Sequence, residues 1–304
     1  MTVFLGIDLG GTTIEGLAVD DNGEPIMRTI ASTRVGSAEA VMSSVVDLVD
    51  SLTTKLDEPP AAIGLGVPGI VEPASGTVRH ALNLGIDAPF PIGSRLSDHL
   101  SGLPVVVEND VRMAAIGAHR HLAQPDDSLV YLGLGTGVAA GIIIDGELHR
   151  GSTGMAGEIG HSSFAPSVVE CRCGRVGCLE AVASGPAIRA IWAGENPAED
   201  LFRLALGGQS DAVSAAMPVV EHLASAIDDL VRMIDPSFVV LGGGVGTSSP
   251  ALHSLLINQF AGMADNVLLS DSDLQARLHQ LPSDWPAGAQ GASWIARNTT
   301  TQEG

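Results

Sequence analysis

The sequence contains little positive charge. It has 15 lysine and arginine residues against 35 aspartates and glutamates, which gives a formal net charge of −20, and Lys55 is its single lysine. Because a nucleic-acid-binding protein needs a cationic face against the phosphate backbone, this balance argues against a nucleic-acid partner. A polyanionic small ligand would have to be held chiefly by backbone N–H groups, a bound cation and a few arginines.

The sequence also lacks a long apolar run. Glycine and aspartate interrupt the hydrophobic stretches well short of a membrane span. The N-terminal residues carry no basic segment, and Asp8 breaks their apolar run, so we expect neither a targeting peptide nor a membrane partner. The chain from Arg297 onward resembles a frayed tail.

Cysteine is scarce, and all of it is in one place. The sequence has 3 cysteines, Cys171, Cys173 and Cys178, and His161 lies ten residues before the first of them. Three thiolates and one imidazole complete a tetrahedral zinc site with no open position, which is typical of a structural metal. The alternative is three free buried cysteines, since an odd number leaves one thiol over in any disulfide scheme. Reduced, metal-binding thiols favour a cytoplasmic location.

A weak internal repeat indicates how the 304 residues are organised. The segment from Gly10 to Glu24 and the segment from Gly135 to Glu147 both combine a glycine and threonine turn, an apolar strand and a second turn at Asp-Asn-Gly or Asp-Gly. Two halves that begin alike predict two similar α/β domains facing each other across a central cleft. We place them at 1–122 and 123–287, with a C-terminal helix at 288–297 joining the first.

The spacing of apolar residues predicts the main elements of these domains. A helix is expected from about Ser37 to Lys55, a strand at Ile63–Gly66, and a helix opened by Asp110 after the strand Pro104–Glu108. In the second half a long helix ending near Ile234 leads into a buried strand. Alternating strands and helices indicate mixed sheets covered by helices.

Glycine turns follow four of the strands. They stand at Gly10-Gly11-Thr12-Thr13, at Gly64–Gly69, at Gly135-Thr136-Gly137 and at Gly242-Gly243-Gly244. Glycine lets phosphate oxygens approach backbone N–H groups, which supply the positive charge that the side chains lack. The second turn matches G-x-G-x-x-G, but Glu72-Pro73 follows where a dinucleotide-binding helix should begin, so we reject that interpretation.

Together with Glu108-Asn109-Asp110, Gly157-Glu158-Ile159-Gly160-His161 and the cysteine segment, these turns resemble the ROK family of sugar kinases and sugar-responsive repressors. The resemblance runs from about Val3 to Arg297 and keeps the order of the family's motifs. It implies the two-domain actin/hexokinase-like ATPase fold with mixed sheets. It also implies transfer of the ATP γ-phosphoryl group to a sugar hydroxyl, with ATP and Mg²⁺ as cofactors beside the structural zinc.

The resemblance assigns roles residue by residue. It implies that Asp8 acts on Mg²⁺ through water. The first phosphate loop would consist of Gly10, Gly11, Thr12 and Thr13, and the second of Gly135, Thr136 and Gly137. The adenosine would be approached by Gly242, Gly243 and Gly244. The sugar is met by Asn83, Asn109, Asp110, Glu158, His161 and Glu180. His161 also ligates zinc, and Asp110 is the general base.

Local chemistry permits simpler roles for some of these residues. Asp at a strand-to-helix junction is an ordinary helix N-cap, a role compatible with that of a base. Glutamates such as Glu158 and Glu180 are commonly solvated surface groups, although two acids attached to a zinc loop suit the reception of adjacent sugar hydroxyls.

Several residues depart from the family pattern that the chain resembles. Thr13 stands where lysine is common, Ile86 replaces an aromatic residue, and Arg112 replaces an asparagine. Val138-Ala139-Ala140 interrupt a glycine run and are expected to crowd the second phosphate loop.

Three functions fit the pattern to different degrees. The first is an ATP-dependent hexokinase acting on a 6-hydroxyl, with glucose foremost and N-acetylmannosamine or N-acetylglucosamine as alternatives. A sugar-sensing repressor would carry an N-terminal helix-turn-helix, whereas here the first phosphate-loop strand begins at Val3. A zinc hydrolase would need an open metal position. The family resemblance also predicts a homodimer.

Overall fold

The chain forms two compact units in the computed structural model, which describes residues 1–164, 169–261 and 270–301. The first unit consists of Met1–His121, Gly151–Gly154 and Pro286–Gly304. The second consists of Leu122–Arg150 and Met155–Trp285. The short segment Gly151–Gly154 thus belongs to the first unit although both of its flanks belong to the second.

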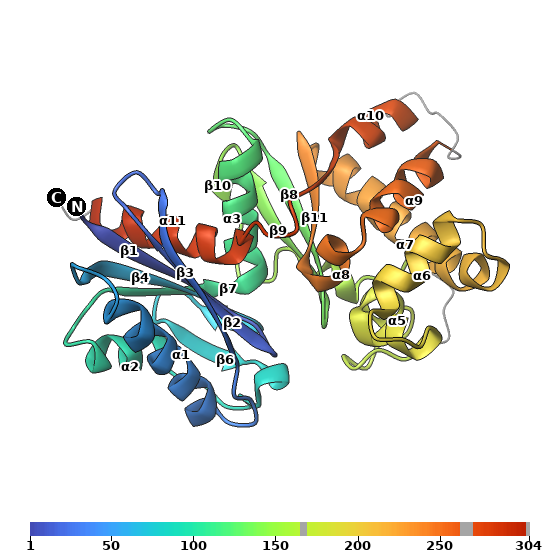
Figure 1. The fold of residues 1–304 in the computed structure, drawn as a ribbon. Coiled ribbons are helices and arrows are strands. Elements are labelled where there is room, and N and C mark those ends of the chain that lie inside the picture. The colour runs from blue at the N-terminus through green and yellow to red at the C-terminus, as the bar shows by residue number, and fades with distance from the viewer. Residues whose placement is uncertain (165–168, 262–269, 302–304) are drawn as a thin grey trace. The chain divides into compact units, whose positions relative to one another are not determined.

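The first unit is built on a five-stranded mixed sheet in the order β3-β2-β1-β4-β7 (Figure 1). The pairs β1–β2 and β2–β3 are antiparallel, whereas β1–β4 and β4–β7 are parallel. Its strands are β1 (Val3–Leu9), β2 (Thr13–Val19), β3 (Pro25–Ser32), β4 (Pro60–Val67) and β7 (Val105–Asn109). After β4 the chain forms a small antiparallel sheet of β5 (Ile70–Glu72) and β6 (Thr77–His80). No helix follows the Gly64–Gly69 turn, as predicted when the dinucleotide interpretation was rejected.

The second unit repeats this arrangement with a sheet in the order β10-β9-β8-β11-β12. Here too the first two pairs are antiparallel and the last two are parallel. The strands are β8 (Leu129–Leu134), β9 (Val138–Ile144), β10 (Glu147–Leu148), β11 (Phe238–Gly242) and β12 (Leu278–Gln280). The hairpins β1–β2 and β8–β9 are therefore equivalent, which confirms the repeat seen in the sequence.

Helices cover both faces of the first sheet, with α1 and α2 on one face and α11 on the other (Figure 1). They are α1 (Ala38–Thr53), α2 (Ile92–His99), α3 (Asp110–Leu122) and α11 (Ala287–Thr301), with a 3-10 turn at Leu82–Leu84. Ser37 caps α1 by accepting a hydrogen bond from the backbone of Ala40 at 3.2 Å. The predicted helix at this position is confirmed.

Helix α11 lies unusually close to the strands. A Cβ atom on Gly6 of β1 would lie 2.0 Å from the carbonyl oxygen of Ala289, and one on Gly64 of β4 would lie 2.0 Å from that of Ala292. Only glycine permits this approach. The expectation of a frayed tail from Arg297 onward is wrong for residues 297–301, because α11 continues to Thr301 and the guanidinium of Arg297 donates to the backbone oxygen of Asp21 at 2.7 Å. Residues 302–304 lie outside the described part of the chain.

The core of the second unit lies between its sheet and a group of helices. The long helix α7 runs from Ser210 to Ile234 and contributes ten buried residues. Its buried side chains join those of β8, β9 and β11 in one hydrophobic cluster. The other helices are α4 (Glu180–Ala183), α5 (Gly185–Ile191), α6 (Pro197–Leu206), α8 (Gly243–Ser248), α9 (Pro250–Phe260) and α10 (Asp271–Arg277), with a 3-10 turn at Ile159–His161.

Candidate functional site

Two carboxylates meet at the edge of the first sheet where parallel strands end. Asp8 lies near the end of β1, and Asp110 follows β7 directly as the first residue of α3. Gly66 of β4 lies between them, because a Cβ atom on it would be 3.4 Å from the Cα atom of Asp110. The carboxyl ends of parallel strands are where ligands bind in α/β folds.

Asp8 has an electrostatic environment that opposes its ionisation. Burial of its carboxyl raises the pKa to about 8, and the nearby charges of Asp110 and Glu15 contribute to this rise. A cation bound beside this pair would remove the opposing charge, and carboxylate oxygens are ligands that suit Mg²⁺. The donor set at this edge therefore fits the magnesium predicted for it.

The strand-to-helix junction is capped by Asn109. The Oδ1 atom of Asn109 accepts from the backbone N–H of Arg112 at 3.2 Å, and its Nδ2 atom donates to the backbone oxygen of Gly69 at 3.2 Å. Asp110 Oδ1 accepts from the backbone N–H of Val111 at 2.9 Å. The prediction of Asp110 as the N-cap is therefore wrong by one residue: Asn109 caps α3 and is fixed on both sides of its amide, and Asp110 is the first residue of the helix.

The glycine turn between β1 and β2 lies next to Asn83. The turn is closed by a hydrogen bond of 2.9 Å from the backbone N–H of Gly10 to the oxygen of Thr13, and Thr12 is exposed. A Cβ atom on Gly11 would lie 3.5 Å from the Nδ2 atom of Asn83. The structure therefore places this predicted sugar-binding residue beside the predicted first phosphate loop.

The equivalent turn of the second unit joins β8 and β9. The backbone N–H of Gly135 donates to the oxygen of Gly137 at 2.9 Å, and Thr136 at the tip is exposed. Val138 and Ala140 lie in the hydrophobic core, so these two side chains point inward. The crowding expected of them therefore does not arise from their side chains.

The glycines after β11 are fixed by a buried tyrosine. A Cβ atom on Gly242 would overlap the ring of Tyr131, and the phenolic oxygen of Tyr131 accepts from the backbone N–H of Gly243 at 3.1 Å. Gly243 has a φ angle of 70°, in the left-handed region that favours glycine. Gly242 and Gly243 are therefore required by the local packing and backbone conformation, independently of any ligand. The sequence alone gave no role to Tyr131.

The segment that carries Glu158 and His161 lies directly across β9. A Cβ atom on Gly157 would be 1.8 Å from the backbone oxygen of Ala140, and one on Gly160 would be 1.9 Å from that of Val138. The glycines that flank Glu158 are thus required for this close packing.

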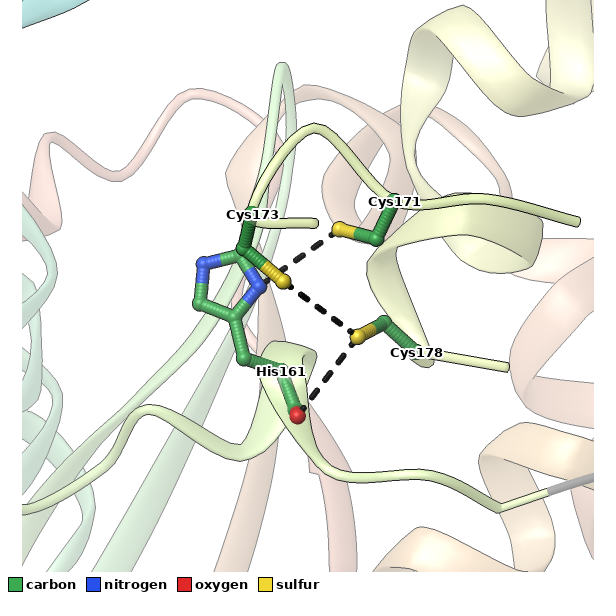
Figure 2. Close-up of side chains that lie close together, drawn as sticks. All are labelled: His161, Cys171, Cys173 and Cys178. Carbon is green, nitrogen blue, oxygen red and sulfur yellow. Dashed lines mark hydrogen bonds between the residues drawn. The ribbon is translucent and has the colours of Figure 1, made fainter. Parts of the chain in front are cut away.

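His161 and the three cysteines come together as predicted (Figure 2). Their ligand atoms all lie within 4.8 Å of one another. The Nδ1 atom of His161 is 3.7 Å from the Sγ atom of Cys171, and the Sγ atoms of Cys173 and Cys178 are 3.6 Å apart. The other ring nitrogen of His161 points away from the sulfurs (Figure 2).

These distances fit a tetrahedral zinc ion. Zn–S bonds near 2.3 Å and Zn–N bonds near 2.0 Å set ligand atoms roughly 3.5 to 3.8 Å apart. Burial raises the pKa of the Cys178 thiol to about 12, whereas a hydrogen bond from the backbone of Arg175 lowers the pKa of Cys173. Bound zinc would offset the cost of ionising the buried sulfur, so the cluster is compatible with structural zinc.

Glu180 links this cluster to the second glycine turn. It follows Cys178 by two residues, and its Oε2 atom accepts from the backbone N–H of Val138 at 3.1 Å. A Cβ atom on Gly137 would lie 2.6 Å from the same oxygen. The guanidinium of Arg172 is 3.7 Å from Oε1, and the Glu180 side chain is 14% exposed. It is therefore no freely solvated surface glutamate.

A family model described as the ROK family matches residues 4–299. The chain belongs to the ROK family. It is 30% identical to a glucokinase of Halalkalibacterium halodurans over 97% of this chain and 94% of that protein. It is 33% identical to an N-acetylmannosamine kinase of Vibrio cholerae over 83% of this chain and 87% of that protein.

A solved ROK structure shares the fold. It is a ROK family glucokinase from Streptomyces griseus in complex with glucose and AMPPNP, with 28% identity, coverage of 97% of this chain and 99% of that one, and a TM-score of 0.80. The predicted actin-like two-domain fold is confirmed. Among the described residues, no helix combines the length and apolar character that crossing a membrane requires.

Each unit of this ROK chain gathers its own group of predicted site residues. Asp8, Asn83, Asn109 and Asp110 occupy the strand ends and turns of the first unit. Glu158, His161 and Glu180 lie around β9 in the second. Reasoning from sequence missed the buried pair Glu108 and Arg112, although their spacing of four residues across the β7–α3 junction is a detectable signal.

Proposed function

We propose that this ROK chain is a hexokinase that transfers the γ-phosphoryl group of ATP to the 6-hydroxyl of a sugar, with glucose as its first substrate. The observation that carries the proposal is that Asp8, two residues before the Gly10–Thr13 turn, and Asp110 both lie beside Gly66 at the strand ends of the first sheet. One carboxylate supports the magnesium of the nucleotide, the other faces the reacting hydroxyl, and backbone N–H groups receive the phosphates. Phosphoryl transfer needs such positioning and charge neutralisation.

Asp110 is proposed as the general base. As the O6–P bond forms and the bond from the γ-phosphorus to the β,γ-bridging oxygen breaks, the hydroxyl proton passes to the Asp110 carboxylate and ADP leaves. Asn109 is held by its capping and Gly69 hydrogen bonds, which fixes the backbone from which Asp110 projects. Mg²⁺, when bound, supplies charge neutralisation on the phosphate oxygens.

Glu158, His161 and Glu180 are proposed to receive sugar hydroxyls, with zinc as the structural brace of their loop. The Nδ1 atom of His161 faces the sulfurs, which leaves its Nε2 atom for a hydroxyl. Carboxylate oxygens suit adjacent hydroxyl donors. Gly135, Thr136, Gly137 and the Gly242–Gly244 segment are proposed for the nucleotide on the basis of the family motifs.

N-acetylmannosamine is the second candidate substrate, because the Vibrio cholerae relative with that activity is 33% identical. ADP release measured with purified protein, ATP and a panel of glucose, mannose, N-acetylmannosamine and N-acetylglucosamine tests both. Turnover of glucose above all others supports the first candidate. Tight sugar binding without turnover of any sugar would contradict kinase activity and favour a sugar-sensing regulator. A homodimer and a cytoplasmic location stay predictions.

A further inference from the structure

Arg112 is a buried cation in the first turn of α3. Its side chain is 7% exposed, and its Nη1 atom is 3.2 Å from the Oε1 atom of Glu108, whose side chain is 1% exposed. A buried guanidinium is tolerated only when its hydrogen bonds are made, so the two side chains are bound to each other in the folded chain.

This ion pair encloses the junction that presents Asn109 and Asp110. The same Oε1 atom of Glu108 accepts from the backbone N–H of Asn109 at 2.9 Å. The backbone N–H of Arg112 donates to the Oδ1 atom of Asn109 at 3.2 Å. Backbone and side chains thus hold the end of β7 and the start of α3 in one arrangement.

The other end of the guanidinium reaches a separate stretch of chain. The Nη2 atom of Arg112 donates to the backbone oxygen of Gly154. Gly154 ends the segment Gly151–Gly154, which belongs to the first unit while the residues on both sides belong to the second. Three residues farther along, the oxygen of Gly157 accepts from the backbone N–H of Ala140 at 2.7 Å.

Glycine recurs along this stretch. Gly151, Gly154 and Gly157 have φ angles of 72°, 77° and 94°, so three glycines within seven residues adopt the left-handed region. The backbone N–H of Ala156 donates to the oxygen of Arg150 at 3.3 Å, and that of Glu158 donates to the oxygen of Met155 at 3.4 Å. The hydrogen bond from Arg112 attaches Gly154, at the middle of this stretch, to helix α3.

We propose that Arg112 is a positioning residue for sugar phosphorylation. It holds Gly154, from which the chain leads through two residues to Gly157 and Glu158, and through Glu108 it holds Asn109 and Asp110. One guanidinium thereby contacts both the junction that presents Asp110 and the segment of the first unit that leads into Glu158. The inference rests on the proposed kinase function, in which Asp110 is the general base and Glu158 receives a sugar hydroxyl.

The experiment compares Arg112→Met, Arg112→Lys and the double variant Glu108→Gln/Arg112→Met with the wild-type protein. Arg120→Met is the matched control, since Arg120 lies on the same helix with an exposed guanidinium over Trp294. The readouts are kcat, the KM values for sugar and for ATP, thermal stability, and hydrogen exchange of the peptide spanning residues 150–158.

Arg112→Met is expected to lower kcat/KM for the sugar by about 10- to 100-fold, with a smaller change in the KM for ATP, because small displacements of positioning groups are that costly. Exchange in residues 150–158 becomes faster. Arg112→Lys recovers part of the activity, because it keeps the charge beside Glu108. Arg120→Met behaves as the wild-type protein.

The double variant separates positioning from stability. It leaves no unpaired buried carboxylate, so thermal stability returns toward the wild-type value while the kinetic defect and the fast exchange persist. Wild-type kinetics and exchange in a stable double variant would overturn the inference. If the wild-type protein phosphorylates no sugar, the proposed function fails, and the exchange comparison still decides whether Arg112 holds the Gly154 segment.

Discussion

The Oε2 atom of Glu180 accepts a hydrogen bond of 3.1 Å from the backbone N–H of Val138. This bond joins the second residue after Cys178 to the first residue after the Gly135–Gly137 turn. A carboxylate proposed to receive sugar hydroxyls is therefore in contact with the backbone proposed to receive phosphate. Because both belong to the same unit, this contact is a property of that unit alone.

Replacing Glu180 should consequently affect both substrates. Glu180→Ala removes the acceptor and is expected to raise the KM for sugar and the KM for ATP. Glu180→Gln keeps an oxygen for Val138 but loses the charge, so the KM for sugar should rise more than that for ATP. Steady-state kinetics with each substrate varied in turn measure the two values. An alanine variant with an unchanged KM for ATP would show that the hydrogen bond to Val138 does not contribute to ATP binding.

The zinc cluster should support both stability and sugar binding. Cys173→Ser is expected to lower the zinc content of the purified protein, its melting temperature and its sugar affinity together, because the metal holds the loop between His161 and Glu180. Elemental analysis, thermal unfolding and sugar titration give the three values. Val176→Ala, at a 50% exposed position of the same loop, is the control. Loss of zinc with unchanged sugar affinity would separate the metal from the sugar site.

Asp110→Asn tests the general base. The amide cannot accept the hydroxyl proton, so kcat is expected to fall by about 10²- to 10⁴-fold. Sugar affinity, measured by calorimetry, should change only a few-fold, because the shape and one acceptor oxygen are kept. Asp98→Asn, at an exposed position of α2, provides the comparison. A variant with near wild-type kcat would mean that another group takes the proton.

Asp8→Asn is expected to abolish turnover and to raise the folding stability at high pH. The folded-state pKa of about 8 lies above the usual value of 3.8, so the folded protein holds more protons than the unfolded chain between these pH values. Stability conferred by the protonated Asp8 is therefore lost as the pH rises from about 4 to 8.

Asparagine has no such loss, so the variant should gain on the order of 5 kcal/mol over the wild-type protein at pH 8, and little at pH 4. Turnover should be lost, because the amide carries no charge for magnesium. Thermal unfolding at both pH values, without magnesium or nucleotide, measures the difference. An equal change in melting temperature at the two pH values would contradict the elevated pKa.

The sequence was informative wherever chemistry is local. The turns at Gly10–Thr13 and Gly135–Gly137 could be located because glycine clusters after apolar strands have few other causes. The cysteines and His161 could be grouped because zinc requires a small set of ligand types at short spacing. The start of α1 at Ser37 and the duplication of the β1–β2 hairpin could also be predicted, because both depend on residues close together in the sequence.

Long-range pairing could not be inferred in this way. The bond from Arg112 to Gly154 spans 42 residues and that from Arg297 to Asp21 spans 276, and no periodicity connects such partners. The prediction of a frayed end at Arg297 was wrong for this reason. Burial could not be inferred either, because two of the three residues expected to crowd the second phosphate loop, Val138 and Ala140, pack into the core.

The contact of α11 with Gly6 and Gly64 has a consequence for biosynthesis. One face of the first sheet is closed by residues near the C-terminus, although the strands beneath them are among the earliest made. While the ribosome is still translating, this apolar face stays uncovered, whereas the strands and helices of the second unit are already complete. We expect the nascent N-terminal half to depend on chaperones until its last helix emerges.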